Sequence, residues 1–394
     1  MREVLEVLEE ALRDNSRVAL ATVVRTEGSA PRAVGTSMVV SDEGTPVGSV
    51  SGGCVEASVL ESAADVLASG VPELHRFGIT DDDGLAIGLT CGGSIEIFIQ
   101  PYAPASCPEF VELLRARREN LPCAMVTVFD GPADLVGHSE LVLQDAEITG
   151  LSVGSTLPFA TVSAANDAVQ QAIASGTTLP VTFATTGTAG SVSLLIDVYR
   201  PPRRLLIFGA IDFSASLAHL GSFLGFHVTV CDARAVFATA ARIPGAHEIV
   251  VDQPDRYLRQ EIARGALARD AVICVLTHDP KFDVPVLDAA LRHGFAYIGA
   301  MGSRRTDRDR RDRLVGLGHT DATLASLRSP IGLDLSAGTA SETAVSIMAE
   351  VIAAKGNASG LPLSQISHPI HRGALRGETS PSRPDGRSHD FSCA

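Results

Sequence analysis

Short hydrophobic runs recur at regular intervals through the second half of the chain. Between them lie segments, such as 215–224, whose apolar residues recur at helical spacing. Strands that alternate with helices in this way predict a parallel sheet. We therefore predict a Rossmann-like doubly wound parallel sheet domain over 203–372. The predicted strands are 205–208, 228–232, 247–251, 271–277 and 296–301.

The first half has shorter and less regular patterns, which predict an N-terminal mixed α/β domain over 1–200. Residues 106–200 are the least readable part, with a helix over 109–118, a helix-like, alanine-rich segment over 161–175 and several short strands. The other predicted elements are helices over 3–14 and 55–67, and strands over 18–24, 37–40, near 74–79 and over 95–99. A turn at 42–44 leads into one more predicted strand.

Prolines and low hydrophobicity mark the boundaries of these domains. The segment 201–204 reads Pro-Pro-Arg-Arg, which interrupts both patterns and predicts a linker. Past Arg372 the residues are mostly Gly, Ser, Pro and Arg, with little that could be buried. We therefore expect 373–394 to be a disordered tail. A chain of 394 residues is long for one hydrophobic core and suits more than one domain.

Charge and cysteine content narrow the class of protein. A formal net charge of −14 argues against a nucleic-acid or anionic-membrane partner, since either would require a basic face. No apolar run approaches the roughly 18–20 residues of a membrane span, and the acidic amphipathic start is unlike a signal peptide. The 7 cysteines contain no C-x-x-C pair, which is typical of reduced thiols and predicts a cytoplasmic location.

A thiol occupies the turn before the predicted helix 55–67. The turn, 51–56, reads Ser-Gly-Gly-Cys-Val-Glu, and its glycines let several backbone N–H groups approach a ligand at a helix N-terminus. We expect Cys54 to be a better nucleophile or metal ligand there than a buried cysteine. A second Cys-Gly-Gly element, 91–93, precedes the predicted strand 95–99. The alternative is that both are tight turns whose cysteines are small core residues.

The predicted Rossmann domain carries an altered nucleotide fingerprint. Asp232 ends the second strand 23 residues after Gly209, where an acid would accept a hydrogen bond from a ribose hydroxyl and favour NADH over NADPH. Arg234, two residues on, could offset the repulsion of a 2′-phosphate. However, Ile211 stands where the second glycine of the fingerprint should be, and Asp212 adds a negative charge. Both features count against ordinary NAD(P) binding. The alternative is a nucleotide fold that is kept for its shape.

Two further segments end strands at the edge where open α/β sheets bind ligands. Gly302-Ser303-Arg304-Arg305 opens an arginine-rich helix, and its two guanidinium groups could grip a phosphate. Alternatively, these arginines pair with nearby aspartates on an exposed helix. The segment Thr277-His278-Asp279 ends another strand, so we expect it at the same cleft, although a lone histidine could equally be structural.

These motifs, together with Gly28-Ser29-Ala30-Pro31-Arg32, resemble the XdhC/CoxI family, from about residue 5 to about residue 372. The resemblance implies a maturation factor for molybdenum hydroxylases such as xanthine dehydrogenase, which binds the molybdopterin cofactor, assists its sulfuration and delivers it to the apoenzyme. The motifs together predict cofactor contacts at Arg32, Ser51, Gly52, Gly53, Cys54, Glu56, Cys91, Gly92, Gly93, Gly209, Asp232, His278, Asp279, Gly302, Ser303, Arg304 and Arg305.

The resemblance also implies the cargo and the partners. The cargo is a molybdopterin-type molybdenum cofactor, in some bacteria a dinucleotide, whose molybdenum or sulfur Cys54 would contact. The partners are an apo molybdenum hydroxylase, a cysteine desulfurase and a second copy of the chain. We expect the Cys54 loop to face the cleft of the second domain, within one chain or across the homodimer. The alternative function is an NAD(P)-dependent oxidoreductase, which only the Rossmann-like pattern supports.

Overall fold

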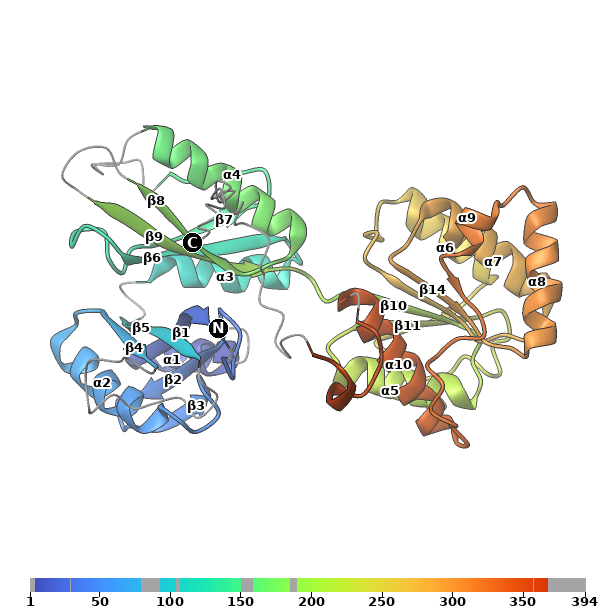
Figure 1. Ribbon diagram of the computed structural model, residues 1–394, viewed down its shortest axis with the longest axis horizontal. Helices are drawn as coiled ribbons and strands as arrows, with labels where there is room; N and C mark the ends of the chain where they lie inside the picture. Colours follow the sequence, from blue (N-terminus) through green and yellow to red (C-terminus); the bar gives the residue numbers. More distant parts are fainter. Residues whose placement is uncertain are drawn as a thin grey trace, which may run out of the picture. The chain divides into compact units, whose positions relative to one another are not determined.

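The computed structural model describes residues 4–28, 30–78, 93–103, 107–149, 159–184, 190–356 and 358–367. Within it the chain forms two compact units, which divide between Pro201 and Pro202 (Figure 1). Cys91, Gly92 and the predicted tail 373–394 lie outside the described residues. In the described part, no helix combines the length and the apolar character needed to cross a membrane.

The second unit is built on a parallel sheet whose strands follow the order β12-β11-β10-β13-β14-β15. This order is that of the Rossmann fold, so the predicted fold class is confirmed. The strands are β10 (Arg204–Phe208), β11 (His227–Asp232), β12 (Glu248–Val251), β13 (Val272–Val275), β14 (Tyr297–Ala300) and β15 (Leu327–Arg328).

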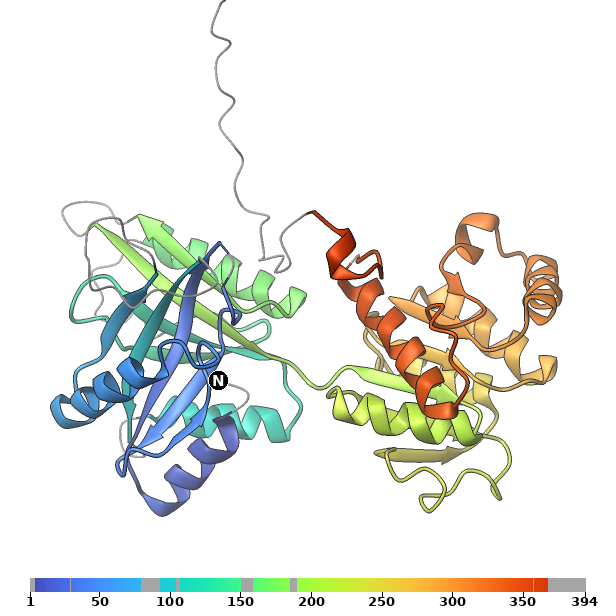
Figure 2. The ribbon, with the colours of Figure 1, turned by 60° about the horizontal axis from the view of Figure 1, so that its bottom comes forward.

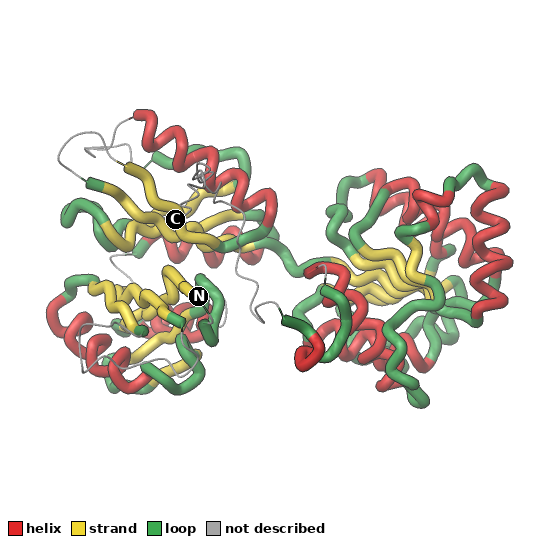
Figure 3. Tube along the Cα trace, in the orientation of Figure 1, coloured by secondary structure: helices red, strands yellow, loops and turns green. Residues whose placement is uncertain are grey.

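Helices cover both faces of this sheet, as Figures 1 and 3 show. Helices α5 (Asp212–Phe223) and α10 (Ala340–Gly356) pack on one face, and α6 (Pro254–Ala263) and α7 (Pro280–His293) on the other. In β13, Val272 and Cys274 join the core under α5 and α10, whereas Ile273 and Val275 join the core under α6 and α7. Successive side chains of a strand point to opposite faces, which explains the uninterrupted apolar runs. The remaining helices are α8 (Arg304–Gly316), α9 (Asp321–Leu324) and a 3-10 turn, Leu363–Gln365.

The first unit contains two antiparallel sheets, with the strand orders β3-β2-β1-β5-β4 and β7-β6-β9-β8. The strands of the first sheet are β1 (Val18–Glu27), β2 (Ser37–Ser41), β3 (Pro46–Gly48), β4 (Glu73–Phe77) and β5 (Ser94–Tyr102). Those of the second sheet are β6 (Cys123–Asp130), β7 (Ser139–Leu143), β8 (Leu179–Ala184) and β9 (Ser191–Tyr199).

The two sheets face each other, and each carries a helix on its outer face (Figures 1 and 2). Helix α2 (Glu56–Ser69) covers the first sheet and α4 (Phe159–Ser175) the second, while α1 (Leu5–Asp14) and α3 (Pro108–Arg118) share one core with strands of both sheets. The inner faces enclose a cavity of about 20 Å³, room for roughly one water molecule.

Polar side chains line this inner layer, which explains why residues 106–200 are hard to interpret from sequence. Asp197, on β9, is buried and accepts hydrogen bonds from the hydroxyl groups of Thr178 (2.9 Å) and Tyr199 (2.6 Å). Thr127, on the neighbouring strand β6 of the same sheet, is also buried. Because these polar residues occupy core positions, the alternation of apolar and polar residues that marks a strand is broken. The segments expected only as short strands form one complete sheet.

Candidate functional site

The Cys54 loop connects β3 to α2 in the first unit. Gly52 and Gly53 have φ angles of 79° and 118°, which L side chains rarely adopt, although a Cβ at either position would meet nothing within 4 Å. The backbone conformation, rather than lack of space, therefore requires glycine here. Cys54 is half-buried and packs against the core beneath α2.

The carboxylate of Glu56, the first residue of α2, lies inside this loop and accepts hydrogen bonds from it. Partial burial acts to raise its pKa, but hydrogen bonds from Ser51, Ser49 and the loop backbone outweigh this effect and lower the pKa to about 2. The carboxylate is therefore ionised at neutral pH. Its donors are the Ser49 hydroxyl (2.7 Å), the Ser51 hydroxyl, and the backbone N–H groups of Ser51 (2.9 Å), Gly52 (3.0 Å), Gly53 (2.8 Å) and Val55 (3.2 Å).

This network corrects one expectation drawn from the sequence. The backbone N–H groups that we expected to approach a ligand are bound by the chain itself. Ser51 completes the set, since its hydroxyl oxygen accepts hydrogen bonds from the N–H groups of Cys54 (2.9 Å) and Val55 (3.0 Å). The loop is thus a nest of donors that already encloses an anion.

The other predicted residues of the first unit are less informative. Arg32 is exposed, and within the described ranges no hydrogen bond or ion pair joins it to the Cys54 loop. Gly93 is buried directly before β5. Cys91 and Gly92 lie outside the described residues, so their predicted role stays a prediction.

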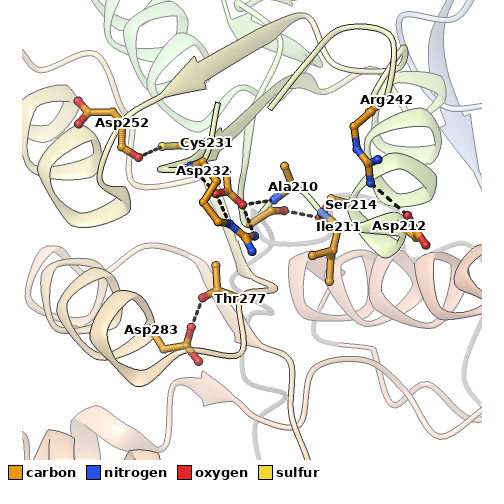
Figure 4. A network of polar contacts seen from close by, with 12 residues as sticks. Ala210, Ile211, Asp212, Ser214, Cys231, Asp232, Arg242, Asp252, Thr277 and Asp283 are labelled. Atoms are coloured by element: carbon orange, nitrogen blue, oxygen red, sulfur yellow. Dashed lines mark hydrogen bonds and ion pairs between the residues drawn. The ribbon is translucent and has the colours of Figure 1, made fainter. Parts of the chain in front are cut away.

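In the second unit, the predicted ribose acid is already occupied. Asp232 is 3% exposed and accepts hydrogen bonds from the N–H of Ala210 (2.7 Å) and from the N–H (2.8 Å), Nε (3.0 Å) and Nη2 (2.8 Å) of Arg234. Figure 4 shows the contact between Asp232 and Ala210. Burial acts to raise the pKa of Asp232, but these hydrogen bonds outweigh it and lower the pKa. A ribose hydroxyl would have to displace Arg234.

The backbone geometry at position 209 requires a glycine whether or not a nucleotide binds there. The φ angle of Gly209 is 108°, and a Cβ there would lie 2.8 Å from Cγ2 and 2.9 Å from the backbone N of Thr277. The glycine therefore lets the end of β10 pack against the segment after β13. Ile211 precedes α5, and the side chain of Asp212, 3.6 Å from Arg242, is exposed (Figure 4).

The segment after β13 contributes a helix cap. Asp279 is the N-cap of α7, and its carboxylate accepts a hydrogen bond from the N–H of Lys281 (3.0 Å) and pairs with Lys281 Nζ (3.3 Å). The backbone hydrogen bond from Lys281 is the main cause that lowers the pKa of Asp279. His278, one residue earlier, is exposed. Asp279 is thus explained by capping, whereas His278 is available to a ligand.

The segment after β14 presents two arginines. Ser303 is the N-cap of α8, and its hydroxyl oxygen accepts a hydrogen bond from the N–H of Thr306 (3.1 Å). Arg304 and Arg305 are exposed, and neither forms an ion pair with any residue that the structure describes. Of the nearby aspartates, Asp307 pairs instead with Arg311 (3.0 Å). These cations therefore remain open to a ligand.

A buried ion pair that no sequence pattern indicated lies beneath this edge. Asp283 on α7 and Arg310 on α8 lie 2.9 Å apart, and each side chain is 3% exposed. The guanidinium of Arg310 also donates to the carbonyl of Met301 (2.8 Å) and the hydroxyl of Ser329 (2.9 Å). Burial raises the pKa of Asp283, and hydrogen bonds from Thr277 and Arg310 offset this only in part. One signal could have revealed Arg310: it lies four residues before the buried Leu314, on the inner face of α8.

The structure therefore gathers the predicted residues into two groups. The loop 51–56 forms one group, and the carboxyl edge of the parallel sheet forms the other, with residues 209, 232, 278–279 and 302–305. Among the described residues, no group of 3 or more His, Cys, Asp or Glu could hold a metal ion. The expectation that the Cys54 loop faces the second cleft stays a prediction.

Comparisons with known proteins cover both units. A family model described as the XdhC and CoxI family matches residues 11–78, and one described as the XdhC Rossmann domain matches residues 205–351. A protein of Bacillus subtilis (strain 168), whose name describes it as a probable xanthine dehydrogenase subunit, is 26% identical, over 88% of this chain and 96% of that protein. The molybdenum cofactor insertion chaperone PaoD of Escherichia coli (strain K12) is 25% identical, over 89% of this chain and 87% of PaoD.

A solved structure has the same fold over nearly the whole chain. It is a crystal structure titled as a xanthine dehydrogenase from Bacillus halodurans, with a TM-score of 0.66 and 23% sequence identity. The similarity covers 90% of this chain and 96% of that chain. The two-sheet unit and the Rossmann unit thus both have counterparts in that protein.

Proposed function

Because the chain belongs to the XdhC and CoxI family, we propose that it binds a molybdopterin-type molybdenum cofactor and inserts it into an apo molybdenum hydroxylase. The observation that carries this proposal is the similarity to a molybdenum cofactor insertion chaperone over 89% of this chain. In this role the cofactor is cargo. The chain holds it and releases it, and turns nothing over by itself.

The chemistry of the two candidate regions supports binding of such a cargo. The Cys54 thiol is a soft ligand, suited to the molybdenum or the sulfur atoms of the cofactor. In the second unit, Arg304 and Arg305 are exposed cations beside the capping hydroxyl of Ser303, suited to the cofactor's phosphate or to a dinucleotide extension. His278 lies three residues after the end of β13, a strand of the same sheet, and is exposed.

The proposal includes three partners. The client is an apo hydroxylase of the xanthine dehydrogenase class, the sulfur donor is a cysteine desulfurase, and a second copy of the chain completes a homodimer. Light scattering on the purified protein tests the dimer, and co-purification with a cysteine desulfurase tests the sulfur donor. A nicotinamide-dependent oxidoreductase is not proposed, since the carboxylate of Asp232 is bound to Arg234 and Ala210.

The test begins with the protein purified from cells that make the cofactor. After acid–iodine oxidation, a bound molybdopterin yields a fluorescent pterin derivative, which we expect from this sample. Protein from a strain that cannot make molybdopterin is the matched control and should yield none. Adding the loaded protein to an apo molybdenum hydroxylase should then restore hydroxylase activity. The proposal is wrong if the loaded sample releases no pterin, or releases only a nicotinamide.

A further inference from the structure

The Cys54 loop has more internal hydrogen bonds than a tight turn needs. We propose that Glu56 is a positioning residue, whose carboxylate fills the donor nest of residues 51–55 so that the loop meets its ligand through the Cys54 thiol and not through its backbone. This inference rests on the proposed function in one respect, that Cys54 contacts the cofactor. Its test needs no cofactor, so the two can fail separately.

Every backbone N–H from Ser51 to Val55 has an acceptor within the loop or on Glu56. Those of Ser51, Gly52 and Gly53 donate to Glu56. Those of Cys54 and Val55 donate to the Ser51 hydroxyl oxygen, which itself donates to Glu56. The carboxylate therefore fixes the loop both directly and through Ser51.

Glu56 does more than an ordinary helix cap, and the chain contains a comparison. Glu342, near the start of α10, accepts hydrogen bonds through Oε2 from the N–H groups of Gly338 (2.8 Å) and Thr339 (2.9 Å), as in a capping box. Glu56 reaches back to Ser49, and both of its oxygens take part. A cap of one helix end does not require these contacts with the preceding loop.

Filling the nest decides which ligands the loop can accept. An empty nest of this kind would bind phosphate or another oxyanion. With the carboxylate in place, a phosphate would meet its negative charge and find no donors. A soft metal or sulfur centre needs only the thiol. The loop is therefore specific for a ligand with a thiophilic centre.

The experiment measures how fast iodoacetamide alkylates Cys54 in the full chain, read by mass spectrometry of the Cys54 peptide. The variants are Glu56→Ala, Glu56→Gln and Glu56→Asp, and the matched control is Glu61→Ala, an exposed glutamate on the same helix. We expect alkylation to be about tenfold faster in Glu56→Ala and Glu56→Gln, as for the loss of one or two net hydrogen bonds. Glu56→Asp should be intermediate, and Glu61→Ala unchanged.

Added anions separate positioning from a general structural role. Formate should enter the space left in Glu56→Ala and restore slow alkylation, whereas chloride at equal ionic strength should not. Inorganic phosphate should leave the wild-type rate unchanged but slow the reaction of Glu56→Ala. A merely structural role predicts faster alkylation that no anion reverses.

Several outcomes would overturn the proposal. These are a wild-type alkylation rate in Glu56→Gln, no effect of formate on Glu56→Ala, or protection of the wild-type thiol by phosphate. Circular dichroism shows whether each variant folds. If Glu56→Ala does not fold, the comparison of Glu56→Gln with Glu56→Asp decides, since only the aspartate keeps a carboxylate.

Discussion

In each unit, a group that could bind a ligand is already bound by a side chain of the chain itself, and the two side chains have opposite charges. In the first unit a carboxylate, Glu56, fills a nest of backbone donors that surrounds a cysteine. In the second unit a cation, Arg234, covers the acid Asp232 that a nucleotide would use, while Arg304 and Arg305 stay exposed. The first unit is thus suited to soft metal or sulfur chemistry and the second to anions.

This contrast shows why a motif alone does not decide what a site can bind. A Gly-Gly loop at a helix N-terminus predicts an anion site, yet the chain supplies its own anion. An acid at the end of the second Rossmann strand predicts a ribose site, yet the chain supplies its own cation. What each site can bind depends on which groups remain after the internal pairs have formed.

The contrast assumes that the carboxyl edge of the parallel sheet in the second unit is rigid. The largest predicted effect, a loss of stability, tests this assumption. Arg310→Ala should lower the free energy of unfolding by about 3–5 kcal/mol, because it leaves the buried Asp283 carboxylate without its partner. Arg308→Ala, on the exposed side of the same helix, should change it by less than about 0.5 kcal/mol. Urea denaturation measures both. Equal effects of the two variants would show that the pair does not hold the edge.

The anion of the first unit should appear in the pH dependence of stability. The pKa of Glu56 is about 2 in the folded protein, against 4.5 for an ordinary glutamate. The unfolded state therefore takes up a proton first as pH falls, and the stabilisation by Glu56, complete above about pH 4.5, is lost towards pH 2. The difference in unfolding free energy between wild type and Glu56→Gln should shrink from about pH 6 to about pH 3. A constant difference would mean that the shape of the side chain matters more than its charge.

The cations of the second unit should affect binding and leave stability unchanged. The double variant Arg304→Ala/Arg305→Ala should weaken retention of the phosphate-bearing cofactor about tenfold, as for one lost charge-assisted hydrogen bond. The loss should become smaller at high salt. The control is Arg308→Ala/Arg313→Ala, two exposed arginines further along α8. If the control weakens retention equally, overall charge matters rather than the start of the helix.

The smallest effect is expected for nicotinamide dinucleotides. Because Asp232 is bound to Arg234 and Ala210, neither NADH nor NADPH should bind below about millimolar concentration. Fluorescence titration of the wild-type protein checks this. Micromolar binding of NADH would show that Arg234 yields to a ribose, and tighter binding of NADPH would contradict the ribose role predicted for Asp232.

Patterns of neighbouring residues were sufficient to predict the second unit. Its central strands, β10, β11, β13 and β14, are buried on both faces, so runs such as 271–277 stand out as uninterrupted apolar segments. The sheet formed by β6 to β9 was not recognisable, because Thr127 and Asp197 place polar groups on its buried face. Buried polar side chains are stable at those positions because they form hydrogen bonds within the inner layer. Those hydrogen bonds form only once the chain has folded.

The remaining features that could not be predicted from the sequence are contacts between particular side chains. Arg310 and Asp283 are 27 residues apart and meet only because α7 and α8 pack together. Glu56 belongs to the predicted motif, but its reach back into the loop depends on the positive φ angles of Gly52 and Gly53. Such contacts follow from backbone geometry that short-range patterns do not encode.

The central claim is that Cys54 holds the molybdenum cofactor, and one measurement tests it most directly. The cofactor content of purified wild type, Cys54→Ser and the control Ser58→Ala is compared after acid–iodine oxidation. We expect Cys54→Ser to fold normally and to bind the cofactor more weakly by about 1–3 kcal/mol, the cost of losing one soft or charge-assisted contact. Ser58→Ala should match the wild type. Equal cofactor content in wild type and Cys54→Ser would contradict the claim and leave Cys54 a structural residue of the loop.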